Sequence, residues 1–227
     1  MTVGRAHFHD DLGDLQTRSL AMFDLVLTAL DRVIEALEHQ DIELAQIVID
    51  DDAVIDATYV ELHHAILSLL TLQAPVAGDL RRLAALLHII RYAERMGAQC
   101  LSIAKLIPLS GHEPPVRDEI LERVVNMGRH ARCEVVQCRR AFADGNVAMA
   151  EDLVKRDREV NLLNREIFKL SIDAGDDADT REWAMTMTLV ARAFERVGDN
   201  AVDVGEQTAF VATGLFREFA DASRSAD

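Results

Sequence analysis

The sequence predicts an all-α fold, built as a tandem repeat of two antiparallel three-helix bundles with six helices in total. Three observations lead to this prediction. Of the 227 residues only 4 are Pro and 11 are Gly, which leaves long stretches without helix-breaking residues. Apolar residues recur at helical spacing along most of the chain. The second half also repeats the first, as the related segments AERMGAQC at 93–100 and FERVGDNA at 194–201 indicate.

The first repeat, residues 1–107, is predicted to contain three helices. The first spans residues 12–39 and has acidic residues before or within its first turn, where they favour a helix N-terminus. Asp41 is placed to cap a second helix that extends to about residue 72. Residues 75–78 (PVAG) interrupt the pattern before a third helix, which begins at 75 or 77 and ends near 107. The inward-facing residues are expected to be Leu15, Met22, Val26, Leu30, Val33 and Leu37, then Ala45, Ile49, Ile55, Leu62, Ile66 and Leu69, then Leu83, Leu87, Ile90, Gly97, Leu101 and Ala104.

A proline-rich stretch at 108–115 (PLSGHEPP) is the predicted linker, and residues 116–227 form the second repeat. Its helices are expected at about 116–143, from the turn at 145–146 to about 172, and at about 180–219 or ending at Gly214, after an acidic loop at 174–179. A short polar tail follows. An offset of 105 residues aligns the first two helices of the repeats, and an offset of 101 aligns the third.

The chain is acidic, with a formal net charge of −15 at pH 7 and a pI near 4.9. This charge argues against nucleic acid as a partner, and it suits basic protein surfaces, metal cations or solubility alone. The longest apolar run, residues 83–90, is interrupted by His88, so no transmembrane segment is expected. The polar N-terminus is no secretory signal, and three cysteines without paired spacing indicate reduced thiols in a cytoplasmic protein.

Two acidic clusters, one in each repeat, are the candidate functional sites. On the third helix of the second repeat, Glu195 and Asp199 lie four residues apart and project from one otherwise apolar face. Acids in a core cost free energy unless a cation or a hydrogen-bond donor meets them. The middle helix of this repeat carries Asp157 and Asn161 at the same spacing, so the four side chains could face one another.

The corresponding residues of the first repeat are Asp52, Asp56 and Glu94. Carboxylate and amide oxygens from two helices form a hard-donor site for a divalent or trivalent metal ion such as Mg, Mn, Fe or Zn, not a thiolate zinc site. The alternative is a solvated helix face that binds no metal. Gly97 and Gly198 each cost a helix roughly 1 kcal/mol relative to Ala. Close helix packing or room for an ion would explain them, and we favour close packing.

No catalytic constellation is recognisable in the sequence, which has no nucleophile elbow and no phosphate-binding glycine loop. Glu61 and His64 form one Glu-x-x-His motif, whereas a carboxylate-bridged di-iron bundle needs two. We therefore expect His63 and His64 to be exposed and the protein to be no enzyme. Arg95 and Arg196 are expected to extend to solvent. The alternatives are a carboxylate-bridged metal-binding helical-bundle enzyme and a helical scaffold whose acids are structural.

Three motifs in this order resemble the PhoU family of phosphate-transport regulatory proteins. They are Asp52-x-x-x-Asp56, the segment PVAGDLR at 75–81 and the Glu-Arg-x-Gly segments at 94 and 195, and the similarity covers about residues 10–213. The resemblance implies two three-helix bundles side by side and a non-enzymatic, cytoplasmic negative regulator of phosphate uptake and of the phosphate-starvation response. The implied partners are the ATPase subunit of a phosphate ABC transporter, a sensor histidine kinase at the inner face of the membrane, and a second copy of the chain in a homodimer.

The resemblance also implies metal ligands, which are Asp52, Asp56 and Glu94 in the first bundle and Asp157, Glu195 and Asp199 in the second. Two departures from the family pattern bear on this set. Ala98 stands where the family's Glu-x-x-x-Asp motif has its second carboxylate, and Asn161 gives the second middle-helix pair a neutral oxygen. The second site should therefore hold a metal ion better than the first.

Overall fold

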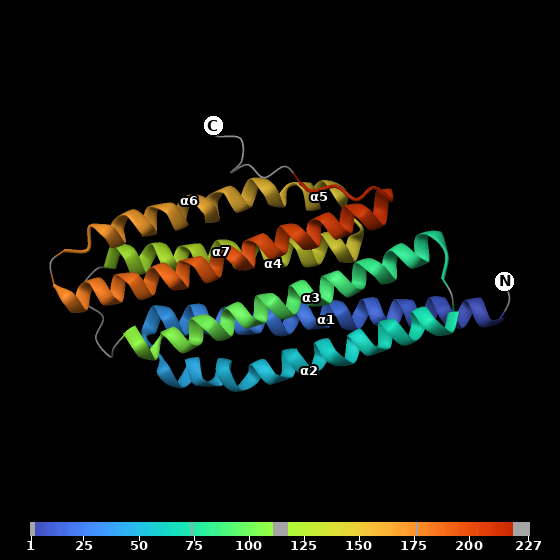
Figure 1. The fold of residues 1–227 in the computed structure, drawn as a ribbon, viewed down its shortest axis with the longest axis horizontal. Coiled ribbons are helices and arrows are strands. Elements are labelled where there is room, and N and C mark those ends of the chain that lie inside the picture. Colours follow the sequence, from blue (N-terminus) through green and yellow to red (C-terminus); the bar gives the residue numbers. More distant parts are fainter. Residues whose placement is uncertain (1–2, 74, 111–117, 176, 220–227) are drawn as a thin grey trace.

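The computed structural model describes residues 3–73, 75–110, 118–175 and 177–219, and this part of the chain is helical without a strand (Figure 1). The helices are α1 (Val3–His39), α2 (Ile42–Gln73), α3 (Ala77–Leu106), α4 (Asp118–Asp144), α5 (Val147–Glu151), α6 (Leu153–Ile172) and α7 (Ala178–Thr213), with a 3-10 turn η1 (Pro108–Ser110). Short α5 and long α6 are separated only at Asp152 and together take the place of one predicted helix. The predicted all-α class with six long helices is therefore confirmed.

The long helices lie side by side in two groups (Figure 1). Helices α1, α2 and α3 pack against one another, and α4, α6 and α7 form the second group. Contacts of α1 with α4 and of α3 with α7 join the groups, so the buried apolar residues form one continuous core. Phe194 on α7 lies in this core, fully buried.

The apolar stripes predicted from the sequence face the core with few exceptions. All six residues predicted for α1 are buried, as are Ala45, Ile55, Leu62, Ile66 and Leu69 on α2. Ile49, Leu87 and Leu101 are only half-buried, and Ile49 and Leu87 pack against the core from its rim. Burial of a large apolar side chain contributes about 1.5–3 kcal/mol, so these stripes supply most of the stability of the fold.

The structure corrects one predicted helix end and decides between two alternatives for another. Helix α1 begins at Val3, because Phe8 and Leu12 are buried and extend the apolar stripe toward the N-terminus. The expectation that its acids mark the first turn is wrong, since Asp10, Asp11 and Asp14 lie well inside the helix. Helix α7 ends at Thr213, which confirms the earlier of its two predicted ends, because Gly214 adopts a left-handed conformation with φ 76°. The predicted linker extends into residues 111–115, which lie outside the described residues.

The same helix–turn–helix geometry appears in both repeats. Asp41 accepts a hydrogen bond from the backbone N–H of Leu44 at 2.9 Å, and Asn146, 105 residues later, accepts one from Met149 at 3.0 Å. The residue before each cap is left-handed, with φ 53° at Gln40 and 60° at Gly145. The turn predicted at 145–146 and the offset of 105 residues are thus visible in the backbone itself.

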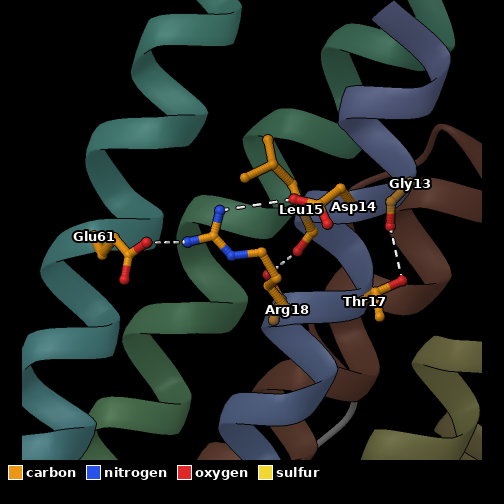
Figure 2. Close-up of polar contacts among 7 residues, drawn as sticks. Gly13, Asp14, Leu15, Thr17, Arg18 and Glu61 are labelled. Atoms are coloured by element: carbon orange, nitrogen blue, oxygen red, sulfur yellow. Dashed lines mark hydrogen bonds and ion pairs between the residues drawn. The ribbon is translucent and has the colours of Figure 1, made fainter. Parts of the chain in front are cut away.

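Helix α2 is the one helix in the described part of the chain whose length and hydropathy would allow it to cross a membrane. Acidic residues interrupt its apolar residues, so no long apolar run marks this helix in the sequence. In the structure α2 packs against α1 and α3, and 22% of its most apolar window is buried. Arg18 of α1 lies between Asp14 of the same helix and Glu61 of α2 (Figure 2). The Nη2 of Arg18 donates a hydrogen bond to the Glu61 carboxylate at 2.6 Å.

Candidate functional site

The four acidic and amide residues predicted for the second repeat line one open cavity of about 480 Å³. Asp157 and Asn161 come from α6, and Glu195 and Asp199 come from α7. Their i, i+4 spacing places each pair on one face of its helix, and packing of α6 against α7 turns the two faces toward each other. The structure therefore brings together all the residues that the sequence predicted for this site.

Two of these side chains are held by neighbouring polar groups. Glu195 is 9% exposed and forms an ion pair with Arg192 one turn earlier on α7. The amide nitrogen of Asn161 donates a hydrogen bond to Asp157 at 2.6 Å. Of the two acids that the sequence placed on an interior face of α7, Glu195 thus has its partner within the chain, whereas Asp199 is exposed to solvent. A bound cation would have to compete with these contacts.

Gly198 leaves the space in which two carboxyl groups meet α7. A Cβ atom at this position would lie 2.6 Å from Oε2 of Glu134 and 2.8 Å from Oδ1 of Asp157. Both separations are far below van der Waals contact, so any side chain at 198 would displace the carboxyl groups. The sequence reading favoured close helix packing for both glycines. That describes Gly97, whose Cβ would lie 3.0 Å from Ile55, whereas Gly198 adjoins carboxyl oxygens.

Glu134 of α4 is a further carboxyl group at this site, and the sequence reading missed it. Its side chain is 1% exposed, and neither of its carboxyl oxygens has a hydrogen-bond partner. The pKa of Glu134 is raised to about 9, mainly by burial and also by the charges of Asp157 and Asp199, against the opposing charge of Arg156. A sequence signal existed, because Glu134 interrupts a buried stripe formed by Met127, Ala131, Cys138 and Ala141.

Two further acids of α7, Asp203 and Glu206, line the same cavity. Burial raises the pKa of Asp203 to about 6, with a further contribution from Asp199 and an opposing one from Arg95 of α3. Burial also raises the pKa of Glu206, although its carboxylate accepts a hydrogen bond from the backbone N–H of Phe219 at 2.6 Å. The segment after α7 therefore folds back along this helix and borders the cavity.

The acids of the first repeat also lie near one another. Burial, followed by the charge of Asp56, raises the pKa of Asp52, and burial raises that of Glu94, with Asp56 and Asp52 among the further causes. Glu94 pairs with Arg91 at 2.9 Å, as Glu195 does with Arg192. Asp52 lines a smaller cavity of about 130 Å³ together with Ala29, Ile55 and Gly97, so apolar groups occupy much of this site.

The residues of the second site fit a hard metal cation by their chemistry. Carboxylate and amide oxygens line the cavity, Glu134 presents two oxygens without hydrogen-bond partners, and Gly198 leaves room beside them. Within the described residues, however, no three His, Cys, Asp or Glu side chains converge closely enough to hold a metal ion. Metal ligation by Asp157, Asn161, Glu195 and Asp199, and by Asp52, Asp56 and Glu94, stays a prediction.

Glu61 and His64 lie apart from both acidic clusters. His64 is exposed on α2, as predicted, and Glu61 is exposed there and pairs with Arg18 (Figure 2). The prediction is wrong for His63, which is half-buried because its ring packs beside that of Tyr59. The arginines that follow the two interior glutamates are exposed, as predicted.

Comparison with known proteins identifies a matching family model. The model of the PhoU domain matches residues 20–107 and 124–208, once in each repeat. A phosphate-specific transport system accessory protein PhoU homolog from Clostridium acetobutylicum is 30% identical over 213 residues, which cover 92% of this chain and 96% of that protein. PhoU homolog 1 of Mycobacterium tuberculosis is 31% identical over 217 residues, covering 93% of this chain and 95% of its own length.

Two solved structures share the fold. The phosphate transport system regulatory protein PhoU from Streptococcus pneumoniae superposes with a TM-score of 0.85 at 21% identity, covering 92% of this chain and 99% of that one. PhoU from Pseudomonas aeruginosa gives a TM-score of 0.82 at 23% identity, covering 92% of this chain and all of that one. At these identities the likeness concerns the arrangement of the helices.

Proposed function

Because the chain belongs to the PhoU family, we propose that it regulates phosphate transport as an accessory protein of a phosphate-specific transport system. The observation that carries this proposal is coverage, since curated relatives whose names state this role align with almost the whole chain and over nearly their own full length. The sense of the regulation is negative: the protein limits phosphate uptake and the phosphate-starvation response when phosphate is plentiful.

The proposed role is that of a non-enzymatic, cytoplasmic adaptor. Its partners are the ATPase subunit of the phosphate ABC transporter and a sensor histidine kinase, and it acts as a homodimer at the inner face of the membrane. The net charge of −15 supports docking on basic surfaces of such partners. Co-purification of the chain with each partner separately tests this arrangement, and failure to retain either protein at low salt would contradict it.

A metal cation is proposed as a resident group of the second acidic cavity. Asp157, Asn161, Glu195 and Asp199 would hold it, and Glu195 would have to release Arg192 to do so. The cation would supply positive charge among side chains that otherwise repel one another, and it would thereby fix α6 against α7. The first cluster, formed by Asp52, Asp56 and Glu94, would hold a cation more weakly, because Ala98 adds no carboxylate.

Gene deletion tests the regulatory function. In the organism that encodes the chain, deletion should raise the transcripts of the phosphate-uptake genes in phosphate-rich medium, and a plasmid copy should restore their repression. Unchanged transcripts in the deletion strain would contradict the proposal.

The second candidate function is a carboxylate-bridged metalloenzyme, which the concentration of acids in one cavity favours. Redox or hydrolytic turnover by the metal-loaded protein, lost in Glu195→Gln, would support it. Metal content by elemental analysis of protein purified without a His tag is the first measurement to make. Absence of stoichiometric metal, together with unchanged metal-dependent stability in Asp199→Ala, would remove both the enzyme and the resident cation.

A further inference from the structure

Glu134 is the buried carboxyl group that the family motifs and the fold leave without a role. It lies on α4, the first helix of the second repeat, whereas the motif acids of that repeat lie on α6 and α7. Its side chain is 1% exposed, and both carboxyl oxygens lack a hydrogen-bond partner. Burying a carboxyl group without a partner costs several kcal/mol, so the position needs an explanation.

The side chain of Glu134 lies behind the acidic cavity, next to Asp157, which lines it. Its Oε2 lies 2.6 Å from the point where a Cβ of residue 198 would stand, and Oδ1 of Asp157 lies 2.8 Å from the same point. A carboxyl oxygen from α4 and one from α6 thus meet over the backbone of α7, where Gly198 keeps the space open. Two carboxyl groups in such proximity repel each other unless a proton or a cation lies between them.

We propose that Glu134 supplies an oxygen ligand from α4 to a hard divalent cation held at the second acidic site, so that all three long helices of the second repeat contribute to it. This inference rests on the cation binding proposed above. Glu134 would add its oxygens to those of Asp157, Glu195 and Asp199, and these side chains would have to move closer together around the cation. The cation would satisfy the two oxygens of Glu134, which have no hydrogen-bond partner, and would join α4 to α6 and α7.

The first repeat supports the assignment by contrast. At the offset of 105 residues Glu134 corresponds to Ala29, which lines the small first cavity together with Asp52 and Gly97. Ala29 therefore occupies the equivalent place without an oxygen to offer. The space beside Gly97 is taken by Ile55, an apolar side chain that cannot bind a cation. The two repeats thus also differ at the helix that carries none of the family motifs.

The test is Mn²⁺ binding to the full-length, metal-free protein, measured by equilibrium dialysis and by the change in thermal midpoint on addition of Mn²⁺. The variant is Glu134→Gln, which keeps the size of the side chain and removes its charge. Glu122→Gln is the matched control, because Glu122 is an exposed carboxylate on the same helix. Where circular dichroism finds that Glu134→Gln does not fold, Glu134→Met replaces it.

We expect Glu134→Gln to raise the Mn²⁺ dissociation constant by about tenfold or more, and to lose the Mn²⁺-dependent rise in thermal midpoint. Glu122→Gln should behave as the wild type. Equal Mn²⁺ binding by Glu134→Gln and wild type overturns the assignment, and Glu134 is then a neutral buried acid. Absence of Mn²⁺ binding to the wild type overturns this assignment and the resident cation together. That result would not bear on the proposed regulation of phosphate transport, which the deletion strain tests separately.

Discussion

At the scale of single residues, the second acidic site depends on the space that Gly198 leaves for neighbouring carboxyl groups. Glycine at this position allows the carboxyl groups of Glu134 and Asp157 to approach the same stretch of backbone. Glycine at position 97 instead admits the side chain of Ile55. The same helix-destabilising residue therefore makes room for polar groups in one repeat and for apolar packing in the other.

The raised pKa of Glu134 predicts a pH-dependent stability. The pKa of its carboxyl group is near 4.5 when exposed and about 9 in the folded protein, so folding favours the protonated form. The associated stability is present below about pH 4.5 and is lost as the pH rises toward about 9. In EDTA, the unfolding free energy of the wild type relative to Glu134→Gln should fall by up to about 1.4 kcal/mol per pH unit within this window.

Urea unfolding of both proteins at several pH values measures this difference. Other titrating groups are common to the two proteins, so their contributions largely cancel. A wild-type stability that changes with pH in parallel with that of Glu134→Gln would contradict the raised pKa.

The turns before α2 and α5 predict a stabilising substitution. Gln40 has φ 53°, a conformation that costs a non-glycine residue roughly 1 kcal/mol, and the equivalent residue in the second repeat is Gly145. Gln40→Gly should raise the unfolding free energy by about 0.5–1 kcal/mol, reduced in part by loss of the hydrogen bond from Gln40 to the Leu37 carbonyl.

Gly145→Ala is the matched control and should lower the unfolding free energy. A Cβ at this position would meet no atom within 4 Å, so its cost reports the backbone conformation alone. Thermal and urea unfolding measure both effects. Destabilisation by Gln40→Gly would show that the left-handed turn carries no such strain.

Only part of the acidic site could be predicted from the sequence. Asp157, Asn161, Glu195 and Asp199 stand in i, i+4 pairs that recur between the repeats, and helical geometry alone places each pair on one face. Glu134 has no paired acid and no counterpart in the first repeat, so repeat comparison could not detect it. Its interrupted apolar stripe marks it as buried, but only the rotation of α4 against α6 and α7 determines what it faces.

At the scale of helices, α1 and α4 are joined by three ion pairs. Asp24, Asp31 and Glu38 recur every seven residues along α1, and they meet Arg139, Arg132 and Arg129 of α4. The contacts run antiparallel, as the two helices do. A period of seven keeps the acids on one face, so the sequence contains this signal, although the partners on α4 could not be assigned before the two helices were placed.

These ion pairs predict a modest, salt-sensitive contribution to stability. Asp31 and Arg132 are partly exposed, with side-chain exposures of 52% and 37%, so water screens their attraction. A double-mutant cycle with Asp31→Asn and Arg132→Gln should give a coupling energy of about 0.5–1 kcal/mol, which should shrink in about 1 M salt. A coupling that is unchanged by salt would contradict an ionic origin.

Helix ends were the least predictable feature at this scale. The acids at positions 10, 11 and 14 indicated a helix N-terminus by their charge, yet burial of Phe8 and Leu12 extends α1 beyond them. The favourable charge of a first turn contributes less than about 1 kcal/mol, whereas burial of each large apolar side chain contributes more. The C-terminal end of α7, by contrast, follows from Gly214 alone.

At the scale of the whole molecule, the two groups of helices share one core. Gly128 of α4 lies where the groups meet, and a Cβ there would stand 2.7 Å from the ring of Phe194 and 3.0 Å from Ile34 of α1. Phe194 is fully buried, so it has little room to move. The tight contact makes the relative position of the two repeats sensitive to a single methyl group.

Gly128→Ala should therefore lower the unfolding free energy by about 1–3 kcal/mol, because overpacking a buried contact exceeds the helix propensity gained from alanine. Gly13→Ala is the control, since its Cβ would meet no atom within 4 Å, and it should be neutral or stabilising. Equal effects of the two substitutions would contradict a close contact at Gly128.

The chain is proposed to limit phosphate transport, and the rate of phosphate uptake tests this role most directly. Cells lacking the gene should take up radiolabelled phosphate faster than wild-type cells in phosphate-rich medium, and a plasmid copy of the chain should restore the lower rate. Equal uptake rates with and without the chain would contradict the account.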